Sequence, residues 1–250
     1  MNHSSSKAGA QRGPDVPSYE VVLAETDWGS LRTAFGNGED LPKLLARLLE
    51  PDPKAQVTAL SELSELVRHQ NSIYEATAPV TMYVAGILTH PAAMVLRPYR
   101  DVPIRATLLN WLASTADDAS DEMVDRTEQW FPGFLTHDTT PAAFRDLRPM
   151  LYRAVEPFLQ DSHDGVRDAA VLAALILAEH PALSRHRDHL AVHARRILDT
   201  SGDAPSRHVA RRALEAWGYE VTVFERLQED QDPQDWGPHS DGRGDLEPPF

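Results

Sequence analysis

The segment from Phe158 to Pro181 reads FLQDSHDGVRDAAVLAALILAEHP. Every residue from Ala169 to Ala178 is apolar, so a helix over this run has no polar face and must be covered by neighbours on several sides. The run is shorter than the roughly 20 apolar residues that a membrane-spanning helix needs. We therefore expect a central, buried helix that is capped by Asp161 or Asp164 and stopped at His180 by the following proline.

The residues of this segment resemble a known repeat. An apolar helix end, an acidic turn, a Val-Arg pair and a row of alanines and leucines follow one another, at Leu159, Asp161, Asp164, Val166, Arg167, Ala169, Ala170, Ala173 and Leu175. This order is similar to the second half of a HEAT repeat, an armadillo-type unit that stacks helical hairpins into a curved solenoid. The resemblance implies an all-α fold, a right-handed α-solenoid of HEAT-like helical hairpins.

Two weaker copies of the pattern lie on either side of the first. The later copy comprises Ile197, Leu198, Arg207, Ala210, Ala213, Leu214 and Trp217. The earlier copy lacks the arginine and comprises Leu48, Leu49, Asp52, Val57, Ala59, Leu60 and Leu63. The stretch HQNSIYEATAPV, His69 to Val80, is also similar to a segment of bacterial HEAT-like proteins. Irregular spacing of the copies indicates a divergent array.

Apolar spacing and helix-breaking residues predict the other elements. Helices are expected over Trp28 to Phe35, Asp40 to Leu49, Val57 to His69, Ala76 to Leu88, Ile104 to Ala116, Met150 to Leu159, Arg185 to Leu198 and Ser206 to Trp217. Proline and glycine predict loops over Thr89 to Pro103 and Trp130 to Pro141. The polar or Pro-, Gly- and Asp-rich ends, 1–18 and 229–250, are expected to be disordered tails, which leaves 19–228 as the solenoid domain.

Composition limits both the compartment and the partner. The chain has no cysteine, so disulfides, thiolate metal sites and cysteine nucleophiles are excluded, and a cytoplasmic location is expected. The formal net charge is -14, from 24 basic and 38 acidic residues. An acidic surface repels phosphate backbones, so we expect no nucleic acid partner and instead a basic protein. No membrane partner is expected either.

No catalytic signature is present in the sequence. A Gly-rich phosphate loop, a Gly-x-Ser-x-Gly elbow and a helical two-His-plus-Glu zinc motif are all missing, and no cofactor is expected. HEAT-like hydroxylases carry paired His-Glu iron ligands, but here only the reverse order occurs, at Glu179 and His180. A DNA-repair glycosylase of similar helical fold uses a basic cleft, which the acidic balance of this chain disfavours.

Three histidines share one face of an expected helix. His186, His189 and His193 stand at i, i+3 and i+7, a spacing at which imidazoles could bind zinc or nickel. Arginines crowd the same helix and would repel a dication, so the preferred interpretation is a solvated polar face without metal.

Two segments are the candidate partner-binding sites. The acidic residues Asp117, Asp118, Asp121, Glu122 and Asp125 form either a helix start or a docking surface for a basic partner. The cluster of His69, Gln70, Tyr74 and Glu75 lies at a hairpin junction, where polar side chains either bind loop backbone groups or contact a partner.

The sequence therefore favours a non-enzymatic, protein-binding HEAT-like scaffold. A specific form of this hypothesis is an immunity or antitoxin-like inhibitor that covers a basic partner. The alternatives are an enzyme, a lyase or a metal-dependent activity, with its site in a cleft between repeats, and a structural adaptor in a larger assembly.

Overall fold

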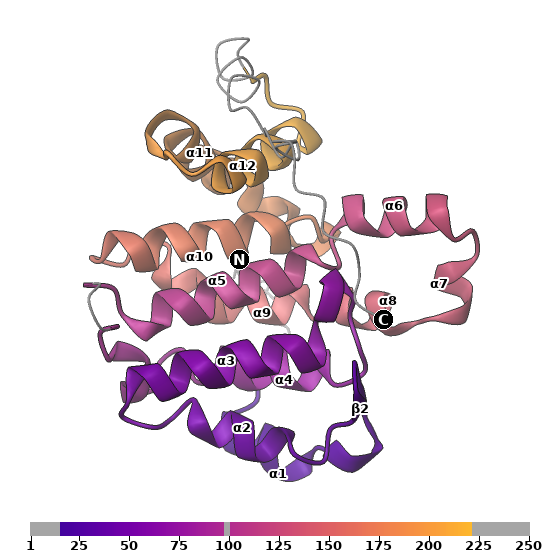
Figure 1. Ribbon diagram of the computed structural model, residues 1–250. Helices are drawn as coiled ribbons and strands as arrows, with labels where there is room; N and C mark the ends of the chain where they lie inside the picture. Colours follow the sequence, from indigo (N-terminus) through magenta and orange to yellow (C-terminus); the bar gives the residue numbers. More distant parts are fainter. Residues whose placement is uncertain (1–15, 98–100, 222–250) are drawn as a thin grey trace, which may run out of the picture.

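Helices make up most of the part of the chain that the computed structural model describes, residues 16–97 and 101–221 (Figure 1). The α-helices are α1 (Tyr19–Glu25), α2 (Leu41–Arg47), α3 (Pro53–Val67), α4 (Thr77–Gly86), α5 (Ile104–Asp117), α6 (Asp121–Trp130), α7 (Phe134–His137), α8 (Thr140–Asp146), α9 (Arg148–Val155), α10 (Asp164–Leu177), α11 (Arg187–Thr200) and α12 (Ala204–Ala216). Between them lie the short 3-10 helices η1 (Trp28–Ser30), η2 (His69–Asn71), η3 (Pro91–Met94), η4 (Glu156–Phe158) and η5 (Pro181–His186), and the antiparallel strands β1 (Arg32–Thr33) and β2 (Gly36–Asn37). The expected all-α class is confirmed.

The expected tails fall almost entirely outside the described residues. Of the segment 1–18 only Val16, Pro17 and Ser18 are described, and the whole of 229–250 is not. Ser18 caps α1, because its hydroxyl oxygen accepts a hydrogen bond from the backbone N–H of Val21 at 3.4 Å.

The predicted central helix is α10, and it is buried as expected. Its alanines Ala170, Ala173 and Ala174 have no exposed surface, and the helix packs along α5 and also contacts α9, α11 and α12. The expected cap was wrong: His163 is the N-cap residue, and its Nδ1 accepts from the N–H of Gly165 at 3.1 Å. Nε2 of the same ring lies 2.7 Å from the carbonyl oxygen of Asp101, so a long-range contact holds the imidazole in the capping position.

The helices are arranged in successive layers that follow the order of the chain. Figure 1 shows α1 and α2 at one end, then α3 and α4, then α5, α9 and α10, and α11 with α12 at the other end. Contacts run from α2 to α3, from α3 to α5, from α5 to α10 and from α10 to α12. The segment from α6 to α8 projects from the side of these layers (Figure 1).

The helix expected over Trp28 to Phe35 does not form. The segment is instead η1 followed by the β1–β2 pair, in which Gly36 has a φ of 138° that favours glycine. Backbone contacts with distant residues explain the difference: the N–H of Ala34 donates to the carbonyl of Leu66 at 2.8 Å, and the N–H of Ala76 donates to that of Arg32 at 3.2 Å. These long-range hydrogen bonds replace the local helical ones.

The expected loop from Trp130 to Pro141 contains a short helix and the start of another. The side chain of Glu128 holds the turn before α7 by accepting from the N–H of Gly133 at 2.5 Å and from that of Leu135 at 3.3 Å. Pro141 stands in the first turn of α8, where the missing donor costs little. The helix expected over Met150 to Leu159 begins earlier, as α9, and gives way to η4 after Val155.

Candidate functional site

Parts of both predicted binding segments meet at one cavity. The cavity has a volume of about 430 Å³ and lies between the loop that follows α3 and the projecting α6–α8 segment. Its walls are formed by Arg32, by all residues from Gln70 to Glu75, by Asp118, by Met123, Val124 and Thr127 of α6, and by Phe131, Phe134, Asp138, Thr140 and Pro141. Cavities of this size hold small ligands or single side chains.

The loop wall of the cavity has an unusual backbone. Gln70 and Asn71 have φ angles of 52° and 57°, in the left-handed region that side chains other than glycine seldom adopt. Glu75 fixes the end of this loop, because its carboxylate accepts from both the backbone N–H and the Nε of Arg32 at 3.0 Å each. The structural interpretation of this cluster is therefore confirmed at Glu75, which binds a backbone group.

The members of this predicted cluster do not all face the cavity. Gln70, Tyr74 and Glu75 are part of its wall, but His69 is not. The imidazole Nδ1 of His69 lies 3.0 Å from the carboxylate of Glu65, and its ring packs edge-on against Phe35 with 4.9 Å between the centroids. His69 therefore lies beside the cavity and supports its loop.

One acid of the predicted acidic stretch reaches the cavity. Asp118 lies on the wall, yet its side chain is only 6% exposed and forms an ion pair of 2.8 Å with Arg68. Burial raises the pKa of Asp118, and the Arg68 guanidinium works against that rise. The ion pair also joins the end of α3 to the end of α5, and this connection brings the two predicted segments together.

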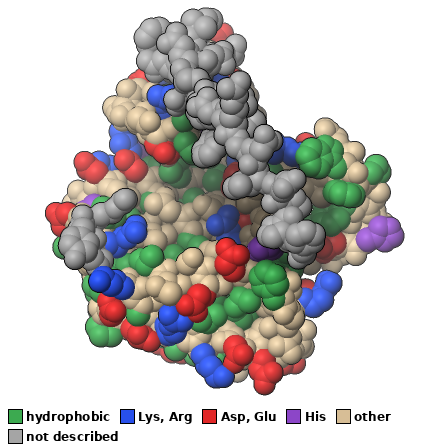
Figure 2. Space-filling model, viewed as in Figure 1, with side chains coloured by type: hydrophobic (Ala, Val, Ile, Leu, Met, Phe, Trp, Pro, Cys, Tyr) green, Lys and Arg blue, Asp and Glu red, His purple; other side chains and the backbone are tan. Residues whose placement is uncertain are grey.

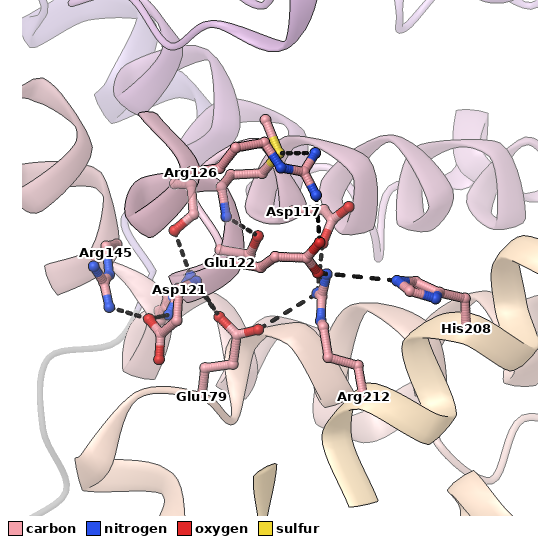
Figure 3. A network of polar contacts seen from close by, with 12 residues as sticks. Asp117, Asp121, Glu122, Arg126, Arg145, Glu179, His208 and Arg212 are labelled. Atoms are coloured by element: carbon pink, nitrogen blue, oxygen red, sulfur yellow. Dashed lines mark hydrogen bonds and ion pairs between the residues drawn. The ribbon is translucent and has the colours of Figure 1, made fainter. Parts of the chain in front are cut away.

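The neighbouring acids are neutralised by arginines of the same chain. Figure 3 shows Asp117 and Glu122 directed toward Arg212 of α12, at 2.6 and 3.2 Å, and Asp121 directed toward Arg145. Within the described ranges, no basic side chain pairs with the exposed Asp125. The acidic stretch is consequently less of an open negative surface than its sequence predicts.

The helix-start interpretation of this stretch holds for Asp121 and Glu122 alone, since Asp117 and Asp118 lie at the end of α5. Ser120 is the N-cap residue of α6, and its hydroxyl accepts from the N–H of Met123 at 3.3 Å. Asp121 and Glu122 occupy the first turn of α6, where negative charge complements the helix dipole.

A buried arginine continues the same network inward. Arg148, at the start of α9, is 1% exposed, and its guanidinium lies 3.1 Å from Glu179 and donates to the carbonyl of Ala119 at 2.7 Å. Glu179 also lies 3.4 Å from Arg212 and accepts from the N–H of Asp121 at 3.1 Å (Figure 3). The network therefore fixes the start of α6, whose next turn forms a wall of the cavity.

The apolar part of the cavity was missed by the sequence analysis. Met123, Val124, Phe131 and Phe134 contribute to it, and the neighbouring Trp130 and Phe131 are 73% and 65% exposed. Hydrophobic side chains gather on the projecting segment in the space-filling view (Figure 2). The available signal was three aromatic residues within five positions around a Pro-Gly turn, which we interpreted as a loop.

The three histidines of the expected polar face are divided between two elements. His186 belongs to η5, where its ring lies 4.5 Å from that of Tyr152, whereas the rings of His189 and His193 contact each other edge-on at 4.9 Å. Burial lowers the pKa of His186 and of His193. Among the described residues, no group of three or more His, Asp or Glu side chains is arranged to hold a metal ion.

Two further hollows lie between α5, α10 and the α11–α12 turn. Their volumes are about 480 and 260 Å³, and they share part of their walls. The acids around them already have structural contacts: Asp117 binds Arg212, Asp168 binds Arg196 at 2.6 Å, and Asp203 caps α12. The enzyme alternative would place its site in this cleft between consecutive hairpins. The three acids around the cleft therefore have structural roles.

Comparison of the chain with models of protein families, with curated proteins and with solved structures gives no match. The HEAT-like resemblance therefore rests on the residues named above. Over residues 16–97 and 101–221, no helix has the length and apolar character to cross a membrane.

The raised pKa of Asp118 predicts how its replacement will depend on pH. A carboxyl group whose folded-state pKa lies above its unfolded value contributes stability at low pH, and this contribution is lost as pH rises through the folded-state pKa. The Asp118→Asn variant lacks this titration, so its stability relative to the wild type should improve from about pH 4 to about pH 7. Urea unfolding of both proteins across this range tests the expectation, and a difference that is constant or moves the other way contradicts it.

Proposed function

We propose that this chain is a non-enzymatic protein-binding scaffold of HEAT-like helical hairpins, and that it acts as an immunity or antitoxin-like inhibitor of a basic partner protein. The observation that carries the proposal is the cavity bordered by exposed aromatic side chains. Trp130 and Phe131 stand largely in solvent at its edge, on a segment that projects from the helical layers. Exposed aromatic residues beside a concave surface are typical of protein–protein contact sites.

The order of helix contacts supports the solenoid part of the proposal. In a solenoid each hairpin contacts its neighbours in the chain, and the second helices of successive hairpins form a continuous row. Here α3, α5, α10 and α12 contact one another in that order, and α4 contacts α9 on the other side of the same layers. The α6–α8 segment is then an insertion between α5 and the hairpin of α9 and α10.

The charge of the chain supports a basic partner, although not through the acidic stretch alone. The net charge of -14 favours fast association with a positively charged protein. Asp117, Asp118, Asp121 and Glu122 already pair with arginines, so their replacement would first disturb the fold. Apolar contact at the aromatic edge is expected to supply most of the affinity, and the overall acidic charge is expected to set the association rate.

A double substitution at the aromatic edge tests this proposal. The Trp130→Ser/Phe131→Ser variant is expected to fold normally, because both side chains are largely exposed, and to lose its partner. Contact residues of this type contribute about 2 kcal/mol or more each, so losing one of them weakens binding about 30-fold and losing both should weaken it on the order of 1,000-fold. The measurement is capture from a lysate of the source organism with immobilised protein, followed by titration of the purified partner.

Val192→Ser is the matched control, since Val192 is a similarly exposed apolar residue on α11. It should bind the partner as the wild type does. The partner is expected to be basic and to associate more slowly as salt is raised. Capture of the same proteins, at the same affinity, by the wild type and the double variant contradicts the proposal.

A further inference from the structure

The cavity at the candidate site combines an apolar wall with carboxylates. Ile73, Met123, Val124, Phe134 and Pro141 supply apolar surface. Glu75, Asp118 and Asp138 supply the negative charges, and Arg32 is the basic residue on the wall. Such a lining suits a ligand with an apolar body and a positively charged end.

The three carboxylates differ in whether a cation already neutralises them. Arg32 pairs with Glu75 at 3.0 Å, and Arg68 pairs with Asp118 at 2.8 Å. Within 16–97 and 101–221, Asp138 pairs with no basic side chain, and one of its oxygens accepts from the N–H of Thr140 at 2.9 Å. Among the three carboxylates on the wall, that of Asp138 is therefore available to pair with a cation of a ligand.

Asp138 and Glu75 lie near each other across the opening between the two segments. Hydrogen bonds from Arg32 lower the pKa of Glu75, and the negative charge of Asp138 acts in the opposite direction. Arg32 is largely exposed, so it neutralises this pair of acids only in part. A second cation beside Asp138 would be attracted by both carboxylates.

We propose that the cavity receives one cationic side chain, an arginine or a lysine, of the partner protein. The aliphatic stem lies against Met123, Val124 and Phe134, and the charged head lies at Asp138. The aromatic rings of Tyr74, Phe131 and Phe134 on the wall add attraction for a cation. This inference rests on the proposed function and names the chemistry by which the partner is recognised.

The size of the cavity agrees with this assignment. At about 430 Å³ it lies near the lower end of the range of about 300 to 1,000 Å³ found for ligand sites. It can take a long side chain but not a whole helix. A basic partner would therefore insert one residue here while the exposed aromatic edge contacts the surrounding surface.

Titration of the whole protein with blocked amino acids tests the inference directly. The probes are N-acetyl-arginine amide and N-acetyl-lysine amide, and their matched neutral controls are N-acetyl-citrulline amide and N-acetyl-norleucine amide. Backbone NMR signals of Tyr74, Thr127 and Asp138 should shift with at least one cationic probe. The corresponding neutral analogue should bind about fivefold more weakly, because a partly exposed ion pair contributes modestly.

Two variants separate a specific site from general charge attraction. Asp138→Asn removes the charge but keeps an oxygen for the N–H of Thr140, so it should fold normally and bind the cationic probe about as weakly as the neutral one. Asp125→Asn makes the same chemical change on an exposed part of α6 outside the cavity and should bind as the wild type does.

The inference is overturned if the charged and neutral probes bind with equal affinity, or if Asp138→Asn binds the cationic probe as tightly as the wild type does. It is also overturned if no NMR signal of the cavity residues shifts. These results are independent of the test of the proposed function. A partner captured through Trp130 and Phe131 whose affinity does not change in Asp138→Asn would preserve that function while excluding the cationic side chain.

Discussion

Replacing Ala173 by Asp is expected to abolish cooperative folding of the whole helical array. Ala173 has no exposed surface and stands in the middle of α10, the helix that contacts α5, α9, α11 and α12. The carboxylate would be buried without a partner, and the extra atoms would push apart helices that approach closely at alanine. A cost above about 4 kcal/mol is expected, which is close to the total stability of many domains.

Ala143→Asp is the control for this experiment, because Ala143 is exposed on α8. It should keep the circular dichroism spectrum and the melting temperature close to those of the wild type. Thermal unfolding followed by circular dichroism compares the three proteins. A sharp transition of Ala173→Asp at the temperature of the wild type would contradict the role of α10 as the buried centre.

The position of α10 could be predicted because its signal is local. A ten-residue apolar run favours a helix that is covered on several sides, and the proline at 181 limits its length. The helix ends before that limit, at Leu177 rather than at the expected His180. The cap could not be predicted in the same way. His163 acts as the cap because its other ring nitrogen contacts the carbonyl of Asp101, 62 residues earlier in the chain.

The errors in element boundaries have the same origin. The segment Trp28 to Phe35 has an apolar pattern suited to a helix, but hydrogen bonds to Leu66 and Ala76 hold its second half in an extended form after η1. In the other direction, Pro141 and the turn residues around it were interpreted as a loop. The fully buried Phe144 explains why α8 forms there nonetheless, since its burial favours an ordered helix over an open loop.

The residues of the candidate site were predicted in part, but their arrangement was not. Gln70, Tyr74, Glu75 and Asp118 were named from sequence and all face the cavity. Their meeting depends on the ion pair between Arg68 and Asp118, and a sequence does not show which of its many arginines a given carboxylate will bind. For the same reason the sequence could not show that the other acids of the stretch pair with arginines, and it therefore predicted an open docking surface there.

The network around Arg148 connects the fold to the candidate site. Its carboxylates, Glu179 and Asp121, lie just after α10 and at the start of α6, and Arg212 adds α12 to the same set of contacts (Figure 3). Burial raises the pKa of Glu179, and Arg148 is the strongest of the charges that oppose this rise. Arg148 therefore favours the charged form of Glu179, whose carboxylate accepts from the N–H of Asp121 at the start of the helix that forms one wall of the cavity.

Arg148→Met is expected to destabilise the protein by about 3 to 5 kcal/mol. The substitution removes a positive charge that neutralises the buried carboxylate of Glu179, and it also removes the donor to the carbonyl of Ala119. The double variant Arg148→Met/Glu179→Gln should recover part of this loss, since the buried carboxylate is then neutral. Urea unfolding at neutral pH measures both effects, and a double variant that is no more stable than the single one contradicts the argument.

Arg196→Met provides the comparison that isolates burial from the chemical change. Arg196 pairs with Asp168 at 2.6 Å, but the two side chains are 34% and 48% exposed, so breaking this pair should cost less than about 1 kcal/mol. If Arg148→Met costs no more than Arg196→Met, the network does not hold the helices together. If Arg148→Met costs far more, the NMR signals of Met123 and Thr127 should also shift in this variant, because the start of α6 is then less firmly held and the cavity wall belongs to the same helix. The same signals should not shift in Arg196→Met.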